Sequence, residues 1–256
     1  MTAHVSLHAM CCGRLDGPRR AFFPDAGADE RLAMPVSCFL VRHAKGSLLF
    51  DTGVACGAVE DPVQVLGEPI ASYFRMAGTT AENVVDQLAL RGMVPDDITH
   101  VACSHLHFDH CGCNRHFPRA KMLVQRAEMD AARKPGSPYG RRWWDVPLDY
   151  HFLDGEHDVF GDGTVVLFPT PGHTAGHQSA IVQTSRQRRF VLAADACYTD
   201  EHLTHDIVPD NHWHERTMRE SMAQLRRLRD QSGTQLLFGH DQAQWQQVEA
   251  LTGALV

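Results

Sequence analysis

The chain has 256 residues, of which 43% are hydrophobic and 21% charged, and its formal net charge is −7. A chain of this length can bury one substantial core, and the composition is that of a globular protein. No apolar run approaches the roughly 20 residues that span a bilayer, and no basic stripe offsets repulsion from phosphates. We therefore expect a single domain over residues 1–256 that binds neither a membrane nor nucleic acid.

The start of the chain and its cysteines bear on location. Residues 1–12 lack a basic segment, and histidines interrupt their apolar stretch, so no secretion signal is visible. The eight cysteines show no repeated C-x-x-C pattern, which fits reduced thiols. Both features favour a cytoplasmic location.

The pattern of hydrophobic residues predicts strands and helices along the chain. Two strands over 37–41 and 47–51 are joined by a turn at 44–46, and a helix over 81–91 opens with the capping-box pattern Thr79-x-x-Glu82. Further helices are expected over 126–133, 215–230 and 242–251. Further strands are expected to end at residues 104, 124, 153, 169, 183, 193 and 238. Interleaved strands and helices are typical of a layered α/β fold.

The most informative motif is Ser-His-Leu-His-Phe-Asp-His over residues 104–110, directly after a predicted strand. Three imidazoles and a carboxylate in six positions carry a desolvation cost that a divalent metal can offset. Residues two apart on an extended chain point the same way, so His105 and His107 can bind one ion. Asp109 and His110 lie past the bend and are free to bind another. The spacing therefore favours a pair of metals.

Three later segments repeat one design, in which a hydrophobic strand and a tight turn precede a ligand-type side chain. They place His173 in Thr-Pro-Gly-His, Asp195 after Val-Leu-Ala-Ala, and His240 after Leu-Leu-Phe-Gly. In a chain with 17 histidines, each of these alone would be an ordinary polar residue. Four such segments together favour a metal site held on loops of a rigid sheet.

The remaining histidines lack this context. We expect His177 not to be a ligand, and surface or loop positions for His202, His205, His212 and His214.

These motifs resemble the metal signature of the metallo-β-lactamase fold. The segments around residues 35–53 and 104–110, Thr-Pro-Gly-His173-Thr-Ala-Gly-His-Gln178, Asp195-Ala-Cys-Tyr198 and Phe238-Gly-His-Asp241 are similar to those of the N-acyl homoserine lactonases. The resemblance runs from about Met34 to His240, and Tyr198 is its most telling feature. It implies a four-layer αββα sandwich with the site along one edge.

The resemblance also implies the roles of the ligands. One metal would be held by His105, His107 and His173, and the other by Asp109, His110 and His240. Asp195 would bridge the two divalent ions, for which zinc is the first choice, although iron, cobalt or manganese also fit nitrogen and oxygen ligands. Asp51 and Asp241 fit positions that orient a metal-bound imidazole. Cys111 and Cys113, beside the motif, are interpreted as small buried residues.

The implied reaction is the opening of a lactone ring by a hydroxide that bridges the two metals. Tyr198 would polarise the ring carbonyl, and Asp109 would return a proton to the leaving oxygen. Orienting Asp195 is the alternative role for Tyr198. The substrate would be a small N-acyl homoserine lactone whose acyl chain contacts apolar walls.

Candidates for those walls are aromatic. They include Phe108 in the motif and the adjacent pair Trp143 and Trp144, which stand in a turn-rich stretch. Two neighbouring tryptophans on a loop favour a ligand wall or a subunit contact, so a homo-oligomer stays open. Two further aromatic pairs lie at residues 22–23 and 73–74.

Three rival functions remain. A glyoxalase II-like thioesterase or another ester hydrolase has the same ligands, although the chain lacks the basic C-terminal region of glyoxalase II. A persulfide dioxygenase would bind one iron and is harder to exclude. A non-catalytic metal-binding protein is disfavoured by the complete set of ligands and Tyr198.

Overall fold

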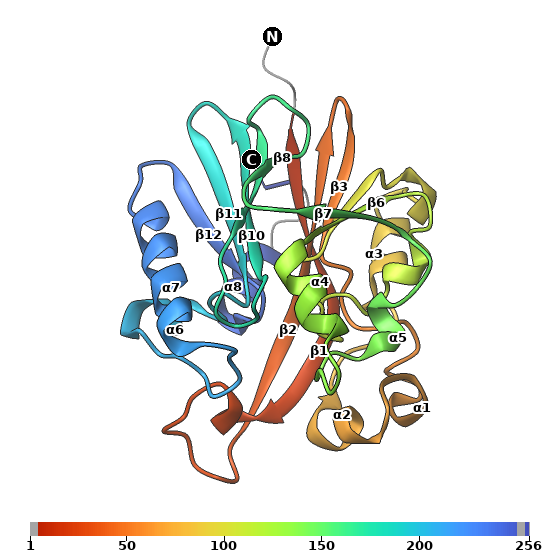
Figure 1. Ribbon diagram of the computed structural model, residues 1–256, viewed down its shortest axis with the longest axis vertical. Coiled ribbons are helices and arrows are strands. Elements are labelled where there is room, and N and C mark those ends of the chain that lie inside the picture. Colours follow the sequence, from red (N-terminus) through yellow and green to blue (C-terminus); the bar gives the residue numbers. More distant parts are fainter. Residues whose placement is uncertain (1–4, 250–253, 256) are drawn as a thin grey trace.

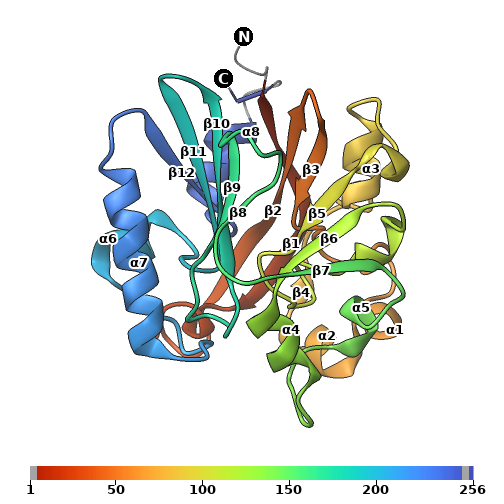
Figure 2. The same cartoon turned by 45° about the horizontal axis from the view of Figure 1, so that its top comes forward.

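The computed structural model describes residues 5–249 and 254–255. Two β-sheets pack face to face, and helices cover the outer side of each sheet (Figures 1 and 2). This arrangement confirms the predicted four-layer αββα sandwich. None of the helices in the described part of the chain combines the length and apolar character that crossing a lipid bilayer requires.

The first half of the chain forms a seven-stranded sheet in the order β4-β1-β2-β3-β5-β6-β7. Neighbouring strands are antiparallel from β4 through β1 and β2 to β3, and parallel from β3 through β5 and β6 to β7. Its strands are β1 (Ser6–Pro18), β2 (Arg31–His43), β3 (Gly46–Phe50), β4 (Arg75–Met76), β5 (His100–Ala102), β6 (Lys121–Gln125) and β7 (Asp149–Leu153).

The second half forms a five-stranded sheet in the order β12-β11-β10-β9-β8, in which only β11 and β12 are parallel among the described pairs. Each sheet is therefore built from one continuous part of the chain. The strands of this sheet are β8 (His157–Asp158), β9 (Val165–Pro169), β10 (Gln178–Ser185), β11 (Arg188–Ala194) and β12 (Thr234–Phe238).

The helices divide between the outer layers (Figure 2). The seven-stranded sheet is covered by α1 (Pro62–Leu66), α2 (Glu68–Tyr73), α3 (Val84–Ala89), α4 (Arg126–Arg133) and α5 (Arg141–Trp144). The five-stranded sheet is covered by α6 (Asp200–His205) and α7 (Glu215–Arg229), and α8 (Gln242–Glu249) contacts β2. Short 3-10 helices are η1 (Arg19–Ala21), η2 (Pro95–Asp97) and η3 (Asn114–His116).

Alternation along the strands places the hydrophobic core in three layers. On β2, Cys38 and Leu40 face the outer helices, whereas Phe39 and Val41 lie between the two sheets. On β11, Phe190 also lies between the sheets, while its neighbour Val191 packs against α7. Successive side chains of a strand point to opposite faces, so a strand that is apolar throughout must be covered on both sides.

Several elements differ from the expectations. The sequence pattern does not predict β1, because polar residues and glycines interrupt its apolar run. The predicted helix over 81–91 is shorter: Asn83 caps α3, while the Glu82 carboxylate accepts a hydrogen bond from the Thr79 backbone and pairs with Arg14 at 2.6 Å. Residues 250–251 of the last predicted helix lie outside the described residues.

Candidate metal centre

All the ligand-type residues lie at one edge of the sandwich, where strands of both sheets end. His105 follows β5 and leads the motif, Asp195 follows β11, and His240 follows β12. His173 lies in the turn between β9 and β10. The structure thus brings together residues that are up to 135 positions apart, and both sheets contribute to the cluster.

Three imidazoles converge at the first position. His105 Nε2 and His173 Nε2 each lie 3.0 Å from Nδ1 of His107. Tetrahedral nitrogen ligands at 2.0–2.1 Å from one zinc ion would lie about 3.4 Å apart. The observed spacing is therefore close to that of three ligands of one ion.

A second trio lies beside the first, and Asp195 faces both. The second trio consists of Asp109, His110 and His240. Asp195 Oδ1 lies 3.3 Å from His110 Nε2 and 3.2 Å from His240 Nε2, while its Oδ2 lies 3.4 Å from His173 Nε2. One carboxylate therefore points one oxygen at each trio, which is the arrangement of a ligand shared by two ions.

The electrostatics of the cluster favour bound cations. His110 Nε2 and Asp195 Oδ1 are buried and make no hydrogen bond to any described residue. Burial lowers the pKa of His105 and of His173 well below the ordinary histidine value, so both rings offer neutral nitrogens. Burial also acts on His110, but the carboxylates around it raise its pKa well above that value. Divalent metals would satisfy the orphaned atoms and balance the carboxylates, so the residues fit two ions.

Hydrogen bonds to residues outside the two trios hold the candidate ligands in place. His110 Nδ1 lies 2.8 Å from Asp51 Oδ2, and the same carboxylate accepts bonds from the backbone and hydroxyl of Ser104. The rings of His173 and His240 face the backbone carbonyls of Asn211 at 3.0 Å and Pro35 at 2.8 Å. Such partners fix ring orientation and leave the other nitrogen for a metal.

Asp241 and His177 lie next to the candidate ligands but have different hydrogen-bond partners. Asp241 does not orient His240; its carboxylate accepts bonds from the backbones of Asp200 and Gln244, so it caps α8. His177 is not among the clustered ligand atoms, as predicted; its Nε2 accepts a hydrogen bond from the Asp195 backbone at 3.1 Å. His177 therefore positions the shared carboxylate.

Glu128, on α4, is a site residue that sequence reasoning missed. Its side chain is fully buried and accepts 3.0 Å hydrogen bonds from the backbones of Leu106 and Gly176. It thereby joins the loop of the first motif to the loop that carries His173. The sequence offers no signal for this, because a glutamate in the first turn of a helix is ordinary on an exposed surface.

A cavity of about 170 Å³ opens beside the cluster. Asp109, Asp195, Tyr198 and His240 supply its polar side, and the Tyr198 hydroxyl lies 3.3 Å from His173 Nδ1. Burial, with Asp195 and Asp109 nearby, raises the pKa of Tyr198 well above its usual value, so the phenol keeps its proton. Most of the remaining wall is apolar or aromatic, made by Leu15, Phe22, Met34, Ile70, Phe74, Phe108, Pro138 and Tyr139.

Trp143 and Trp144 do not line this cavity, so their predicted place in the substrate wall is wrong. Both belong to α5 and are buried in the core, and Tyr150 donates a hydrogen bond to the Trp144 carbonyl at 2.6 Å. The turn-rich sequence suggested an exposed loop, but long-range packing covers it. Tyr139, which sequence reasoning missed, lines the cavity instead.

Other predicted positions can be compared directly. Cys111 and Cys113 are buried, as expected. His205 and His214 are exposed, again as expected. His202 is buried instead, because its ring lies 2.9 Å from the Phe22 carbonyl and 2.7 Å from the Thr199 hydroxyl at the start of α6.

Comparisons with known proteins agree with this geometry. The sequence pattern of the metallo-beta-lactamase superfamily matches residues 31–240. The protein named N-acyl homoserine lactonase AttM is 34% identical to this chain in both Azorhizobium caulinodans and Agrobacterium fabrum, over 86% of each chain. N-acyl homoserine lactonase AiiA of Bacillus thuringiensis subsp. kurstaki is 32% identical over 82% of each chain.

Solved structures show the same likeness. An N-acyl homoserine lactone hydrolase with N-hexanoyl-L-homoserine at its catalytic metal centre has a TM-score of 0.86 and 29% identity, covering 96% of this chain and 97% of that one. A variant of AiiA from B. thuringiensis with N-decanoyl-L-homoserine bound has the same scores and coverage. The fold and the two metal-type trios thus define a metallo-β-lactamase-superfamily protein. Within that superfamily, the chain belongs to the N-acyl homoserine lactonase family.

Proposed function

We propose that this protein is a dinuclear metal hydrolase that opens the lactone ring of N-acyl homoserine lactones, and thereby quenches signalling by them. The observation that carries the proposal is the Asp195 carboxylate, which presents one oxygen to each trio beside a cavity with apolar walls. The named relatives supply the substrate class. Nitrogen and oxygen ligands at nearly tetrahedral spacing favour zinc at both positions.

Metals bound here would supply Lewis acidity and a water with a pKa near 7, the chemistry that ester hydrolysis needs at neutral pH. The protein groups around them orient the substrate and move protons. Tyr198 keeps its hydroxyl proton and would donate a hydrogen bond to the ring carbonyl oxygen. Asp109 lines the same cavity and would hold a proton on its carboxylate and deliver it to the ring oxygen as the ring opens.

The apolar part of the cavity would receive the acyl chain. Phe22, Met34, Ile70, Phe74 and Phe108 present hydrocarbon and aromatic surface to the cavity. Burial of an alkyl chain against such surface contributes about 0.8 kcal/mol for each methylene group. We therefore expect acylated lactones to bind more tightly than the unsubstituted ring.

The experiment is ring opening of N-hexanoyl and N-decanoyl homoserine lactone by zinc-loaded protein, with metals per chain counted in the same sample. Turnover with two bound metals is expected, and Asp109→Asn should lose it. Asp149→Asn, which changes an exposed carboxylate on β7, is the matched control. Two bound metals without lactone turnover would contradict the proposal, and turnover of a thioester in its place would favour the thioesterase alternative.

A further inference from the structure

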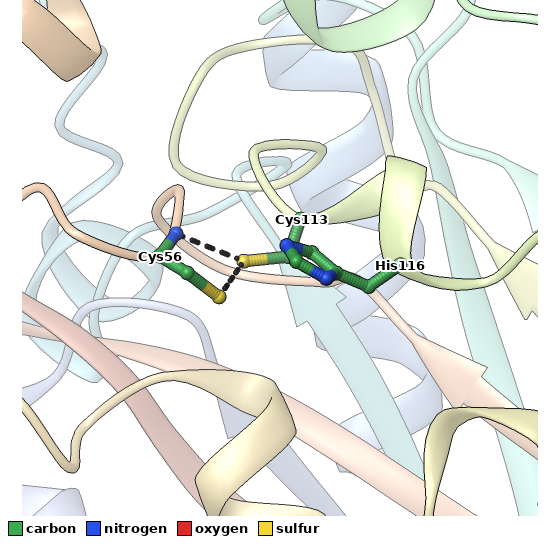
Figure 3. Close-up of side chains that lie close together, drawn as sticks. All are labelled: Cys56, Cys113 and His116. Atoms are coloured by element: carbon green, nitrogen blue, oxygen red, sulfur yellow. Dashed lines mark hydrogen bonds between the residues drawn. The ribbon is translucent and has the colours of Figure 1, made fainter.

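A second cluster of reactive side chains consists of Cys56, Cys113 and His116 (Figure 3). Cys56 is on the loop after β3, Cys113 is three residues beyond His110, and His116 ends η3. The two sulfur atoms are 2.9 Å apart, and one His116 nitrogen lies within 4.8 Å of both. All eight cysteines of the chain are free thiols, and the sulfurs of Cys56 and Cys113 contact each other directly.

The backbone already holds these two sulfurs in position. The Gly112 backbone donates a 3.0 Å hydrogen bond to the Gly53 carbonyl, and the Cys113 backbone bonds the Thr52 hydroxyl at 3.3 Å. The Cys56 backbone itself donates to Cys113 Sγ at 3.2 Å. The two loops are therefore tied together next to the thiols, and a bond between the sulfurs would need side-chain movement of about 1 Å to reach the usual 2.03–2.05 Å.

Cys56 differs from the buried thiols in charge. The contact with Cys113, together with His116, lowers the pKa of Cys56 to about 5 although the side chain is half-buried. Contact with Cys56 raises the pKa of Cys113 and also raises that of His116, which fits a Cys56 thiolate held by a thiol and an imidazolium. Burial instead raises the pKa of the thiols elsewhere: to about 12 for Cys103, and also for Cys11, Cys38, Cys111 and Cys197.

The alternative is that the two cysteines and the histidine bind a metal ion. Two thiolates at 2.3 Å from one tetrahedral zinc ion would lie about 3.8 Å apart. The sulfurs of Cys56 and Cys113 are closer than that, and one of them already shares the proton of the other. The observed separation lies midway between that of a sulfur–sulfur bond and that of two thiolates on one ion, and metal content together with thiol mapping distinguishes the two.

We propose that Cys56 and Cys113 are a peroxide-reactive thiol pair, in which Cys56 is oxidised first and Cys113 then closes a disulfide. The partly exposed thiolate of Cys56 attacks one oxygen of hydrogen peroxide, so that a sulfur–oxygen bond forms, the oxygen–oxygen bond breaks, and the leaving hydroxide takes the proton from His116. Cys113 then attacks the sulfenic acid, and the sulfur–oxygen bond breaks as the disulfide forms. The hydroxide that leaves takes the Cys113 proton, so two thiols lose two electrons and one peroxide becomes two waters.

The role of Cys113 is to make the oxidation reversible. A sulfenic acid with no thiol nearby proceeds to sulfinic and sulfonic acids, which ordinary thiols do not reduce. A resolving thiol at 2.9 Å intercepts it. The pair would therefore absorb peroxide next to the metal centre and return to two thiols in the presence of a reductant.

To test this, the metal-loaded protein is treated with a slight excess of hydrogen peroxide. The remaining thiols are then alkylated in denaturant, and the peptides are mapped. Six alkylated cysteines and one Cys56–Cys113 linked peptide are expected, with all eight thiols recovered after dithiothreitol. Cys113→Ser should trap Cys56 as a sulfenic acid that reacts with dimedone, and Cys56→Ser should leave the other thiols reduced. Cys111→Ala, two residues from Cys113 and equally buried, should form the disulfide as the original chain does.

Three results would overturn the proposal. The first is retention of eight thiols after peroxide, and the second is a disulfide that joins any other cysteines. The third is a metal content that falls by one ion per chain in Cys56→Ser, together with protection of both thiols in the metal-loaded protein, because that would show an ion bound by the cluster. Peptide mapping of the unsubstituted chain decides the first two even where a variant folds poorly.

Discussion

Tyr198 presents a protonated hydroxyl to the cavity beside the two trios. Tyr198→Phe removes this donor while keeping the ring, which packs edge-on against Phe22 with centroids 5.3 Å apart. Loss of one well-placed donor costs about 10²–10³ in rate, so we expect kcat for lactone opening to fall by that factor with two metals still bound. Steady-state kinetics and metal analysis measure both quantities.

Tyr73→Phe is the control for that change, because Tyr73 is 46% exposed and outside the cavity wall. If Tyr198→Phe lost metal and kept its rate per bound metal, the hydroxyl would act by holding His173, which it contacts at 3.3 Å. That outcome would contradict a role in stabilising the carbonyl oxygen.

His177 should make stability depend on pH. Burial lowers its pKa to about 3, whereas the unfolded chain has the ordinary value of 6.5. Below pH 6.5 the unfolded state therefore binds a proton that the folded state does not, and stability falls as pH falls from 6.5 towards 3. The loss is about 1.4 kcal/mol for each pH unit in that window.

His177→Gln isolates this contribution. Urea unfolding of metal-free protein at several pH values should show the free-energy difference between the original chain and the variant shrinking from pH 6.5 to 4.5. His205→Gln, which changes an exposed histidine on α6, should show a difference that is flat over the same range. A constant difference for His177→Gln would mean that its ring binds protons in the folded protein as it does in the unfolded chain.

At the scale of elements, α4 holds two loops of the site together through one side chain. Glu128 accepts bonds from Leu106 and Gly176, and a Cβ atom added at Gly176 would lie 2.1 Å from the Glu128 backbone nitrogen. The loop that carries His173 thus packs directly on the helix. The position of this imidazole is fixed by α4 as much as by the strands that flank it.

Glu128→Ala should therefore damage stability and metal binding together. It leaves two buried backbone N–H groups without an acceptor, at about 1–3 kcal/mol each. We expect the free energy of unfolding to fall by roughly 2–5 kcal/mol, with weaker zinc binding measured by competition with a chromophoric chelator. Asp130→Ala, at an exposed position of the same helix, should change neither quantity.

The sequence could predict those features whose evidence lies within a short stretch of the chain. The motif over 104–110 and the segments of His173, Asp195 and His240 each join a buried strand to a polar turn, so a short window contains both parts. The burial of Glu128, Trp144 and His202 comes from segments far away in the sequence. Strand β1 has a weak pattern of its own and is held by eleven paired positions of β2. Local windows therefore predicted the cluster of ligand-type residues and Asp51 beside His110, and they missed Glu128.

At the scale of the whole molecule, the metal centre joins the two sheets. His105, His107, Asp109 and His110 belong to the seven-stranded half, whereas His173, Asp195 and His240 belong to the five-stranded half. Metals bound to both sets would oppose separation of the layers. They would thus stabilise the folded state as a whole, because the unfolded chain does not assemble these ligands.

Removal of metal should accordingly lower the melting temperature. At a free metal concentration 100 times Kd, each site contributes about 2.7 kcal/mol. For a chain of this size 1 kcal/mol corresponds to roughly 2–4 °C, so chelation should lower Tm by about 10–20 °C when both sites empty. Differential scanning calorimetry before chelation, after it and after zinc is restored measures the change. An unchanged Tm would mean that the sheets hold together without help from the centre.

The consecutive arrangement of the two sheets has a consequence for synthesis of the chain. Every strand of the seven-stranded sheet precedes residue 154, and every strand of the other sheet follows residue 156. Each trio takes two ligands from the first half and one from the second. A chain emerging from the ribosome thus lacks a complete first trio until His173 is made, and a complete second trio until β12 and His240 are made. Tight metal capture is therefore a late event of maturation, and the completed centre marks a chain whose halves have docked in register.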